Sequence, residues 1–360
     1  MDFNEEYYLK VKRLADHIVS STEPKMKWMW GEALLGYALD ELDKENDRTD
    51  YTKFLCDYCD HWAKVDPIVD QSDTAAPGLI TYAMYKRTKK AEYERLTKKV
   101  LDYIRYEPRL YLDCLNHLGC SKKGRIYPKS VWIDSVMMFS VFTSLYAKES
   151  GDKELLDFAA RQPKQYASMM LDKEKDLWAH SYWVKSKRAF PKRDIFWGRG
   201  NGWVVCGFPM ILDNIGYDHK EAPKIIELFS KTSEALLLCM NEDYTFNTLL
   251  KHKSYRELSA TALISAGWLH GIRCGYLDKK FLEPAVKAFE SCVKAIEENE
   301  NGVYMPDISG PTIPLPIFPK LGYKMIPLGK NWSYGVAAII FAAIEYKKCL
   351  KNLDLIKHLF

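Results

Sequence analysis

Two aspartates with apolar neighbours are the side chains in this sequence best suited to acid–base chemistry. Asp73 lies in SDTAAPG, and Asp134 lies in VWIDSVMM, two residues after Trp132. Apolar walls and the charge of a second carboxylate raise the pKa of a carboxyl group, so one member of such a pair can hold a proton near neutral pH. The pair therefore predicts a general acid with a partner carboxylate. Asp is also a good N-cap, so helix capping is the alternative for each residue.

A second group of polar and aromatic residues lies in the middle of the chain. In WGRGNGW, residues 197–203, the glycines let a ligand approach the backbone, and Arg199 offers a planar cation for a carboxylate. Trp197 and Trp203 offer two rings for stacking. His180 precedes this stretch, in LWAHSYW. A helix start without function is the alternative for 197–203, and a structural histidine is the alternative for His180. The G-x-G-x-G spacing does not indicate a nucleotide site, because no strand precedes it.

The cysteines do not predict a metal site. The chain has 9 of them, scattered along its length. Cys56 and Cys59 form a C-x-x-C, and Cys114, His117 and Cys120 lie close together in sequence. Neither group has the second C-x-x-C or H-x3-5-H half that a zinc site usually has. We expect reduced, buried thiols, no metal ion and no cofactor.

The elements that must position these residues are helices. Apolar residues recur at a spacing of three to four almost throughout the chain. Six segments are apolar around most of their circumference: 30–40, 73–86, 134–147, 200–213, 259–276 and 332–345. The segments between them are amphipathic, with a charged face. Helices of the first kind belong in an interior, and helices of the second kind cover them. The pattern predicts an all-α fold, an (α/α)6 toroid, with an irregular α-solenoid as the alternative.

In such a toroid the inner helices run in the same direction, so their N-terminal ends meet at one mouth. The polar residues that open the inner segments should converge there: Asp73, Asp134, residues 197–203, Ser259 with Thr261, and Trp332. Residues 302–330 are rich in Pro and Gly and too long for an ordinary connection. They predict a lid over this mouth or, alternatively, a floppy insertion. We expect one domain over residues 1–360.

Composition and charge exclude several classes of partner. Lys plus Arg (52) nearly balance Asp plus Glu (48), and the formal net charge of +4 does not indicate nucleic acid. No run approaches ~18 apolar residues and the start of the chain has no apolar signal core, so we expect no membrane span. A cytoplasmic protein is expected, unless a leader has been removed. The 10 Trp and 23 Tyr offer many rings for stacking on sugars. The sequence sets no oligomeric state.

The sequence resembles the unsaturated glucuronyl and rhamnogalacturonyl hydrolases, glycoside hydrolase families 88 and 105, with the second the closer match. The resemblance lies in VWIDSVMM (131–138), HSYW (180–183), WGRGNGW (197–203) and YRELSATALISAGWLHGIRCGYLD (255–278). Weaker support comes from SDTAAPG (72–78) and NWSYGVAAIIFAAIE (331–345). The blocks span nearly the whole chain. The resemblance implies an (α/α)6 barrel, in agreement with the six apolar segments.

The resemblance also implies an activity. Such hydrolases act on lyase-generated oligosaccharides, here of the pectin or rhamnogalacturonan type, that carry a 4,5-unsaturated uronic acid at the non-reducing end. An aspartic acid protonates C4, water adds at C5, and the hemiketal collapses to release a 4-deoxy-5-keto-uronate. Asp134 matches the general acid and Asp73 the second carboxylate. The positions that match substrate contacts are Trp132, His180, Arg199 and Trp203. No metal or nucleotide is implied.

Two departures from the family pattern leave the substrate open. Residues 109–130 lack the usual glycine-rich stretch with its histidine, and RELS replaces the more frequent ETS. The sugar that follows the unsaturated uronate is therefore not determined. For Asp134 we expect a raised pKa, since a proton donor must stay partly protonated near working pH. The alternatives are another carbohydrate-active toroid enzyme (a lyase, an epimerase or an inverting glycosidase), because a fold does not fix its chemistry, and a non-catalytic carbohydrate-binding protein.

Overall fold

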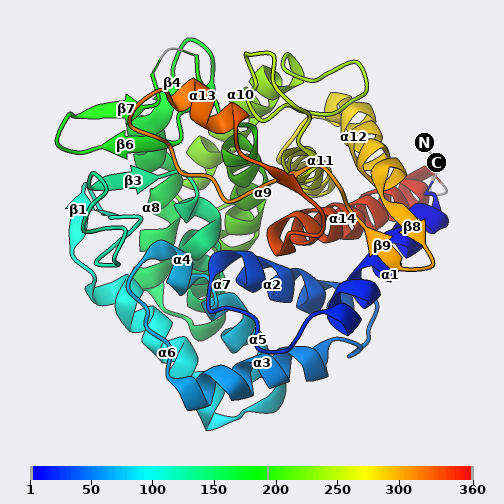
Figure 1. Cartoon of the computed structure of the whole chain (residues 1–360), viewed down its shortest axis with the longest axis horizontal. Helices are drawn as coiled ribbons and strands as arrows, with labels where there is room; N and C mark the ends of the chain where they lie inside the picture. Colours follow the sequence, from blue (N-terminus) through cyan, green and yellow to red (C-terminus); the bar gives the residue numbers. More distant parts are fainter. Residues whose placement is uncertain (1–2, 193, 358–360) are drawn as a thin grey trace.

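The computed structural model describes residues 3–192 and 194–357, with side chains up to residue 351. Six helices line the interior of a ring (Figure 1): α2 (Trp30–Glu45), α5 (Gly78–Thr88), α7 (Val141–Ser150), α9 (Gly198–Ile215), α11 (Leu258–Arg273) and α14 (Ser333–Lys357). Each inner helix packs against the next, and the last, α14, packs against the first, α2. The ring is therefore closed. The (α/α)6 toroid predicted from the sequence is confirmed, and the open solenoid is wrong.

Six further helices cover this ring from outside (Figure 1): α1 (Glu5–Ser21), α3 (Thr52–Val65), α6 (Ala91–Tyr106), α8 (Lys153–Met170), α10 (Ala222–Leu237) and α12 (Leu282–Ala295). Their amphipathic sequences explain this position. In α6, for example, Leu96, Val100 and Ile104 are buried at a spacing of four, whereas the acidic and basic residues of its first turns face solvent. By contrast, α11 is buried from Leu258 to Ile272. A helix such as α6, with one apolar face, therefore lies in the outer layer, and a helix such as α11, apolar on all faces, lies in the inner layer.

Small residues let the inner helices approach one another closely. A Cβ atom added to Gly267 of α11 would overlap the backbone carbonyl of Val205 in α9. Since only glycine lacks that atom, Gly267 sets the distance between these two helices.

The strands of the described residues are short and lie in the connections. The longest sheet has the antiparallel order β3-β6-β7, from β3 (Ser130–Trp132), β6 (Ser181–Trp183) and β7 (Arg188–Phe190). In this sheet Trp132 pairs with Ser181, and the Ile133 amide donates to the His180 carbonyl at 3.0 Å. The pairing places Asp134 beside His180, although 46 residues separate them in the sequence. The remaining strands form two-stranded pairs: β1 (Arg109–Tyr111) with β2 (Cys114–Leu115), β4 (Leu171–Asp172) with β5 (Leu177–Trp178), β8 (Glu297–Asn299) with β9 (Gly302–Tyr304), and β10 (Ile308–Ser309) with β11 (Leu328–Gly329).

Residues 302–330 fold onto the body of the molecule and are not a floppy insertion. They contain β9, β10, a short helix α13 (Pro319–Lys324) and β11. The Tyr127 hydroxyl donates to the Pro314 carbonyl at 2.6 Å, and the Tyr255 hydroxyl donates to the Tyr323 carbonyl at 3.1 Å. In Figure 1 this segment, in orange, crosses in front of α9. That it opens and closes as a lid stays a prediction.

Candidate active site

Asp73 and Asp134 lie at the same mouth of the ring. Asp73 is in the single-turn helix α4 (Ser72–Ala75), before α5, and Asp134 precedes a π-helical turn, Val136–Ser140, that leads into α7. Their neighbours Ser72 and Ser135 are in contact, with 3.4 Å between the hydroxyl oxygens. Capping does not explain Asp73, because the side chain of Gln71 caps α4. The turns that carry the two acidic residues selected from the sequence are therefore neighbours, as the toroid requires.

His117 contacts Asp73 and Ser135, the residue that follows Asp134. Its Nε2 is 3.3 Å from Asp73 Oδ1, and its Nδ1 is 3.0 Å from the Ser135 hydroxyl. Its ring stacks on Trp132, with 4.4 Å between centroids and 8° between planes. Residues 109–130, which lack the family's usual glycine-rich stretch, thus still bring a histidine to the mouth. The available signal was a histidine shortly before the WIDS motif, but two nearby cysteines directed attention to a metal.

His180 contacts Asp134 directly. His180 Nε2 lies 3.2 Å from Asp134 Oδ2, yet neither atom has a partner with hydrogen-bond alignment among the described residues. The other ring nitrogen, Nδ1, is 2.7 Å from the Tyr323 hydroxyl of α13. The His180 ring stacks on Trp197 at 4.3 Å and meets Trp132 edge-on at 5.1 Å. Buried polar atoms without a partner are rare in folded proteins, so these two are available to a ligand.

The electrostatics of this pair differ from the expectation. Burial raises the pKa of Asp134, but the charge of His180, its polar contact and the charge of His117 outweigh it, so the pKa lies below the usual value. Burial also lowers the pKa of His180, although Asp134 opposes this. The raised pKa predicted for Asp134 is therefore wrong for the ligand-free protein. Two histidines, neither recognised from the sequence as a charge partner, cause the difference.

Arg199 holds the segment 302–330 in place. Its side chain is 0% exposed, and its guanidinium donates to the Ser309 and Gly310 carbonyls, each at 2.8 Å. The guanidinium also lies over the rings of Trp197 and Tyr334, 4.8 Å from each centroid. Arg199 Nη1 also lies 3.5 Å from Oε1 of the buried Glu257, so the protein itself supplies both carbonyl and carboxylate partners. No exposed surface is left for the substrate carboxylate that the sequence assigned to Arg199.

The other residues predicted at this mouth are also engaged by the protein. Trp203 is buried and meets Trp30 of α2 edge-on at 6.1 Å. The Ser259 hydroxyl donates to Glu257, the N-cap of α11, at 2.6 Å, and the Thr261 hydroxyl donates to the Glu257 carbonyl at 2.9 Å. Trp332, directly before α14, is exposed. Of these predictions, only the position at the helix starts is confirmed.

Two aromatic residues of the site, Tyr323 and Tyr127, could not be selected from the sequence, because they lie in connections without a motif. Trp197 was expected as one of the two stacking rings of WGRGNGW. The Tyr127 ring meets Trp132 edge-on at 5.5 Å. Together these rings give the site walls of the kind that stack on sugars.

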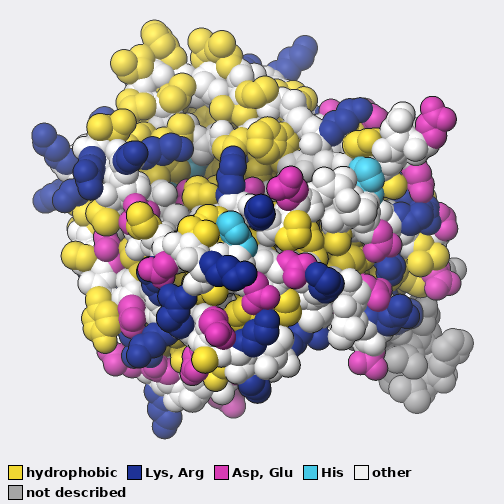
Figure 2. Space-filling view, turned by 60° about the horizontal axis from the view of Figure 1, so that its bottom comes forward, with side chains coloured by type: hydrophobic (Ala, Val, Ile, Leu, Met, Phe, Trp, Pro, Cys, Tyr) yellow, Lys and Arg dark blue, Asp and Glu magenta, His cyan; other side chains and the backbone are white. Residues whose placement is uncertain are grey.

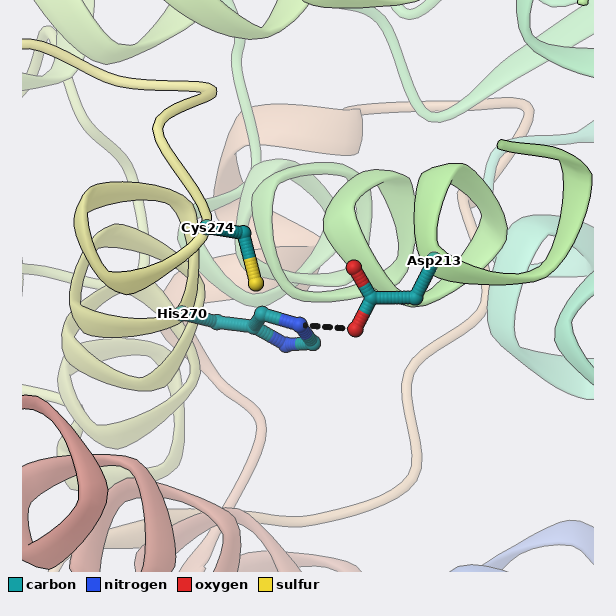
Figure 3. Close-up of side chains that lie close together, drawn as sticks. All are labelled: Asp213, His270 and Cys274. Carbon is teal, nitrogen blue, oxygen red and sulfur yellow. Dashed lines mark hydrogen bonds and ion pairs between the residues drawn. The ribbon is translucent and has the colours of Figure 1, made fainter. Parts of the chain in front are cut away.

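A second polar cluster lies at the C-terminal ends of the inner helices (Figure 3), the opposite end from Asp134. Asp213 of α9, His270 of α11 and Cys274 present an oxygen, a nitrogen and a sulfur atom within 4.8 Å of one another. His270 Nε2 is 2.8 Å from Asp213 Oδ2, and Nδ1 is 3.8 Å from Glu345 Oε1. Both sides of the ring thus face carboxylates of neighbouring helices. The cluster borders a charged cavity of about 430 Å³, and we interpret it as an ion-pair network between the helix ends.

The cysteines noted in the sequence do not assemble a comparable group. Cys59 and Cys114 are buried, Cys56 is partly exposed and Cys120 is exposed. His117, which lies between Cys114 and Cys120 in the sequence, contacts Asp73 and Ser135. No helix of the described residues is both long and apolar enough to cross a membrane.

Comparison with known proteins gives a family match over most of the chain. The model of Glycosyl Hydrolase Family 88 matches residues 6–350. An unsaturated 3S-rhamnoglycuronyl hydrolase from Alteromonas sp. (strain LOR) is 25% identical over 260 residues, which is 69% of this chain and 60% of the relative. The unsaturated rhamnogalacturonyl hydrolase YesR from Bacillus subtilis (strain 168) is 22% identical over 347 residues, 95% of this chain and 96% of the relative. The chain thus spans under two thirds of the first relative and nearly all of the second.

Solved structures agree in fold. A family 105 glycoside hydrolase from C. acetobutylicum ATCC 824 superposes with a TM-score of 0.85 at 21% identity, covering 94% of this chain and 99% of the other. The unsaturated glucuronyl hydrolase of Bacillus sp. GL1, described as responsible for glycosaminoglycan degradation, gives a TM-score of 0.74 at 14% identity, covering 94% and 96%. At these identities the likeness shows the fold.

Proposed function

Because this chain belongs to Glycosyl Hydrolase Family 88, we propose that it removes a 4,5-unsaturated uronic acid from the non-reducing end of lyase-generated oligosaccharides. The observation that carries the proposal is the arrangement around Asp134: a buried carboxylate with a free oxygen, beside His180 and close to a second carboxylate, Asp73. The names of the relatives support an unsaturated uronyl substrate, and the relative that this chain covers almost completely, YesR, supports the rhamnogalacturonan type.

In the proposed reaction Asp134 transfers a proton to C4 of the enol ether. The pKa of Asp134 is low in the free protein, so Asp134 is ionised there and has to take up a proton when the substrate binds. The carboxylate of the unsaturated sugar supplies a negative charge that raises the pKa of Asp134, because like charges disfavour ionisation. Burial, the effect that already raises this pKa, becomes stronger as the sugar displaces water.

After the proton transfer, Asp134 is again a carboxylate and can accept a proton from water. The water oxygen bonds to C5, and the product is a hemiketal. The hemiketal opens to a ketone at C5, and the hemiacetal left at C1 expels the following sugar. One water molecule is consumed, and C1 is not attacked directly, unlike in the usual two-carboxylate glycosidases.

The neighbouring residues have supporting roles in this proposal. Asp73, held by His117, accepts hydrogen bonds from sugar hydroxyls, and Trp132 forms an apolar wall. His180, held through Nδ1 by Tyr323, positions Asp134 through Nε2. Arg199 acts through the segment that it anchors, and Trp203 supports the mouth from behind through Trp30. No metal or cofactor is required.

The substitution Asp134→Asn tests the proposal. It keeps the shape of the side chain and removes the transferable proton, so turnover should fall by ~10²–10⁴-fold, the usual contribution of a general acid. The C4=C5 bond conjugated to the carboxylate absorbs ultraviolet light, so turnover of an unsaturated disaccharide is followed as a loss of absorbance. Asp102→Asn, an exposed position on α6, is the matched control and should change nothing.

Three results would contradict the proposal. An Asp134→Asn variant that kept more than about a tenth of the wild-type rate would remove Asp134 as the acid. A rise of absorbance with an unmodified polysaccharide would indicate a lyase. Binding of unsaturated disaccharides from pectin, rhamnogalacturonan and glycosaminoglycan digests without any turnover would indicate a carbohydrate-binding protein.

A further inference from the structure

Four stretches of the chain contain no acidic residue at all. They lie between Asp113 and Asp134, between Asp176 and Asp194, between Asp243 and Glu257, and between Asp307 and Glu345. Elsewhere acidic residues are frequent, since the chain has 48 Asp and Glu in 360 residues. The same stretches are rich in exposed cations: Lys122, Lys123, Arg125, Lys129, Lys185, Lys187, Arg188, Lys192, Lys251, Lys253, Lys320 and Lys324.

These cations lack acidic partners. Within the described part of the chain, none of the twelve has a carboxylate oxygen within 4.0 Å, although lysines elsewhere form many such pairs, for example Lys53 with Asp57. Two of the acidic residues that bound these stretches are paired with other residues: Asp194 with Lys175, and Asp307 with Arg256. We call the twelve residues the basic collar.

The four stretches are neighbours in space. The Val184 amide donates to the Lys129 carbonyl at 3.3 Å, which joins the first two. The Tyr127 hydroxyl bonds to Pro314, and the Tyr255 hydroxyl bonds to Tyr323, which joins the first and the third to the fourth. The charges of Lys320 and Lys324 also reach His252, where they lower its pKa together with burial, the larger effect.

The basic collar borders the proposed active site. Tyr127 touches Trp132, and Tyr323 touches His180, so the collar begins one side chain away from the residues around Asp134. Figure 2 shows Lys and Arg side chains gathered at the left of the molecule, and hydrophobic side chains along its top. Cations that lie close together repel one another, and a bound anionic ligand reduces this repulsion. The positive potential of the cations also attracts such a ligand from a distance.

We propose that the basic collar binds acidic groups on the sugar units that follow the unsaturated residue, so that the preferred substrate is a polyanionic oligosaccharide and not a neutral one. The inference rests on the proposed function and adds the class of substrate to it. Carboxylate and sulfate groups share the required charge. Exposed apolar residues of the same stretches, Ile126, Ile317 and Phe318, offer surface for the sugar rings between those groups.

The test compares kcat/KM for three unsaturated oligosaccharides with the same first linkage, in which the following sugars are neutral, carboxylated or sulfated. Wild-type protein should turn over at least one charged substrate ~10-fold faster than the neutral one at low salt, and added salt should remove the advantage. Of the two charged substrates, the one with the higher kcat/KM shows whether the collar prefers carboxylate or sulfate groups.

Charge reversal then assigns the effect to the collar. The pairs Lys122→Glu with Lys123→Glu and Lys320→Glu with Lys324→Glu should each lower kcat/KM for the charged substrate ~10-fold, and by less than about twofold for the neutral one. Lys98→Glu with Lys153→Glu, exposed on the outer helices α6 and α8, is the matched control and should leave both unchanged.

The outcomes separate the two proposals. If no unsaturated substrate is consumed, the proposed function fails. If neutral and charged substrates are consumed equally well, without salt dependence, only the collar inference fails. It fails as well if collar variants lower turnover of the neutral substrate as much as that of the charged one, or if the control pair has the same effect as the collar pairs.

Discussion

The ion-pair network around His270 allows a prediction with a calculable size. His270 lies between Asp213 at 2.8 Å and Glu345 at 3.8 Å, and Arg273 binds the two Glu345 oxygens at 2.6 and 3.0 Å. Burial lowers the pKa of His270, but Glu345 and Asp213 outweigh it and raise the pKa to about 10, from a usual value of 6.5. The imidazolium therefore helps to hold α9, α11 and α14 together.

The sign of the pH dependence follows from this shift. Above pH 6.5 the unfolded chain has released the proton, while the folded protein keeps it up to about pH 10. The free energy of unfolding therefore receives its full contribution below pH 6.5 and loses ~1.4 kcal/mol for each pH unit of increase within this window. From about pH 7 to about pH 8.5, the loss attributable to His270 is ~2 kcal/mol. Buried cysteines such as Cys206 and Cys292, whose pKa burial raises, add a loss of their own as the pH rises, but this loss is common to wild type and His270→Gln and cancels in the difference between them.

Urea unfolding at the two pH values, for wild type and for His270→Gln, measures this contribution. The neutral variant should be less stable at pH 7, and the difference between the two proteins should shrink by ~2 kcal/mol at pH 8.5. His61→Gln, a partly exposed histidine on α3, is the control and should keep the wild-type dependence. Parallel curves for wild type and His270→Gln would refute the ion-pair interpretation, because then the proton on His270 would not be linked to folding.

Two further substitutions test single contacts. Tyr323→Phe removes the hydroxyl next to His180 Nδ1, so kcat should fall ~10-fold and the acidic limb of its pH profile should move, with little change in Tm; an unchanged pH profile would mean that the contact only supports the fold. Gly267→Ala places a methyl group against the Val205 carbonyl, so the free energy of unfolding should fall by about 1–3 kcal/mol or more, whereas equal stability by urea unfolding would show that α9 and α11 can move apart.

The sequence alone determined the helices and their division into two layers, because both follow from the pattern of apolar and charged residues within each helix. Apolar residues around α11 and a charged face on α6 are readable without knowledge of their neighbours, and they decide which helix is buried. Once six inner helices are placed in parallel, their first residues must meet. This geometric necessity, and the unusual apolar setting of Asp73 and Asp134, allowed both residues to be selected.

Only the tertiary structure decided what surrounds those aspartates. His117 reaches Asp73, and Tyr323 reaches His180 across 143 residues of sequence, through connections that carry no periodic signal. The pKa of Asp134 follows from these neighbours, which is why the expectation of a raised pKa, based on the role of a proton donor, had the opposite sign. Arg199 illustrates the same limit. Its charge suggested a ligand, but its burial and its carbonyl partners are set by residues more than a hundred positions away.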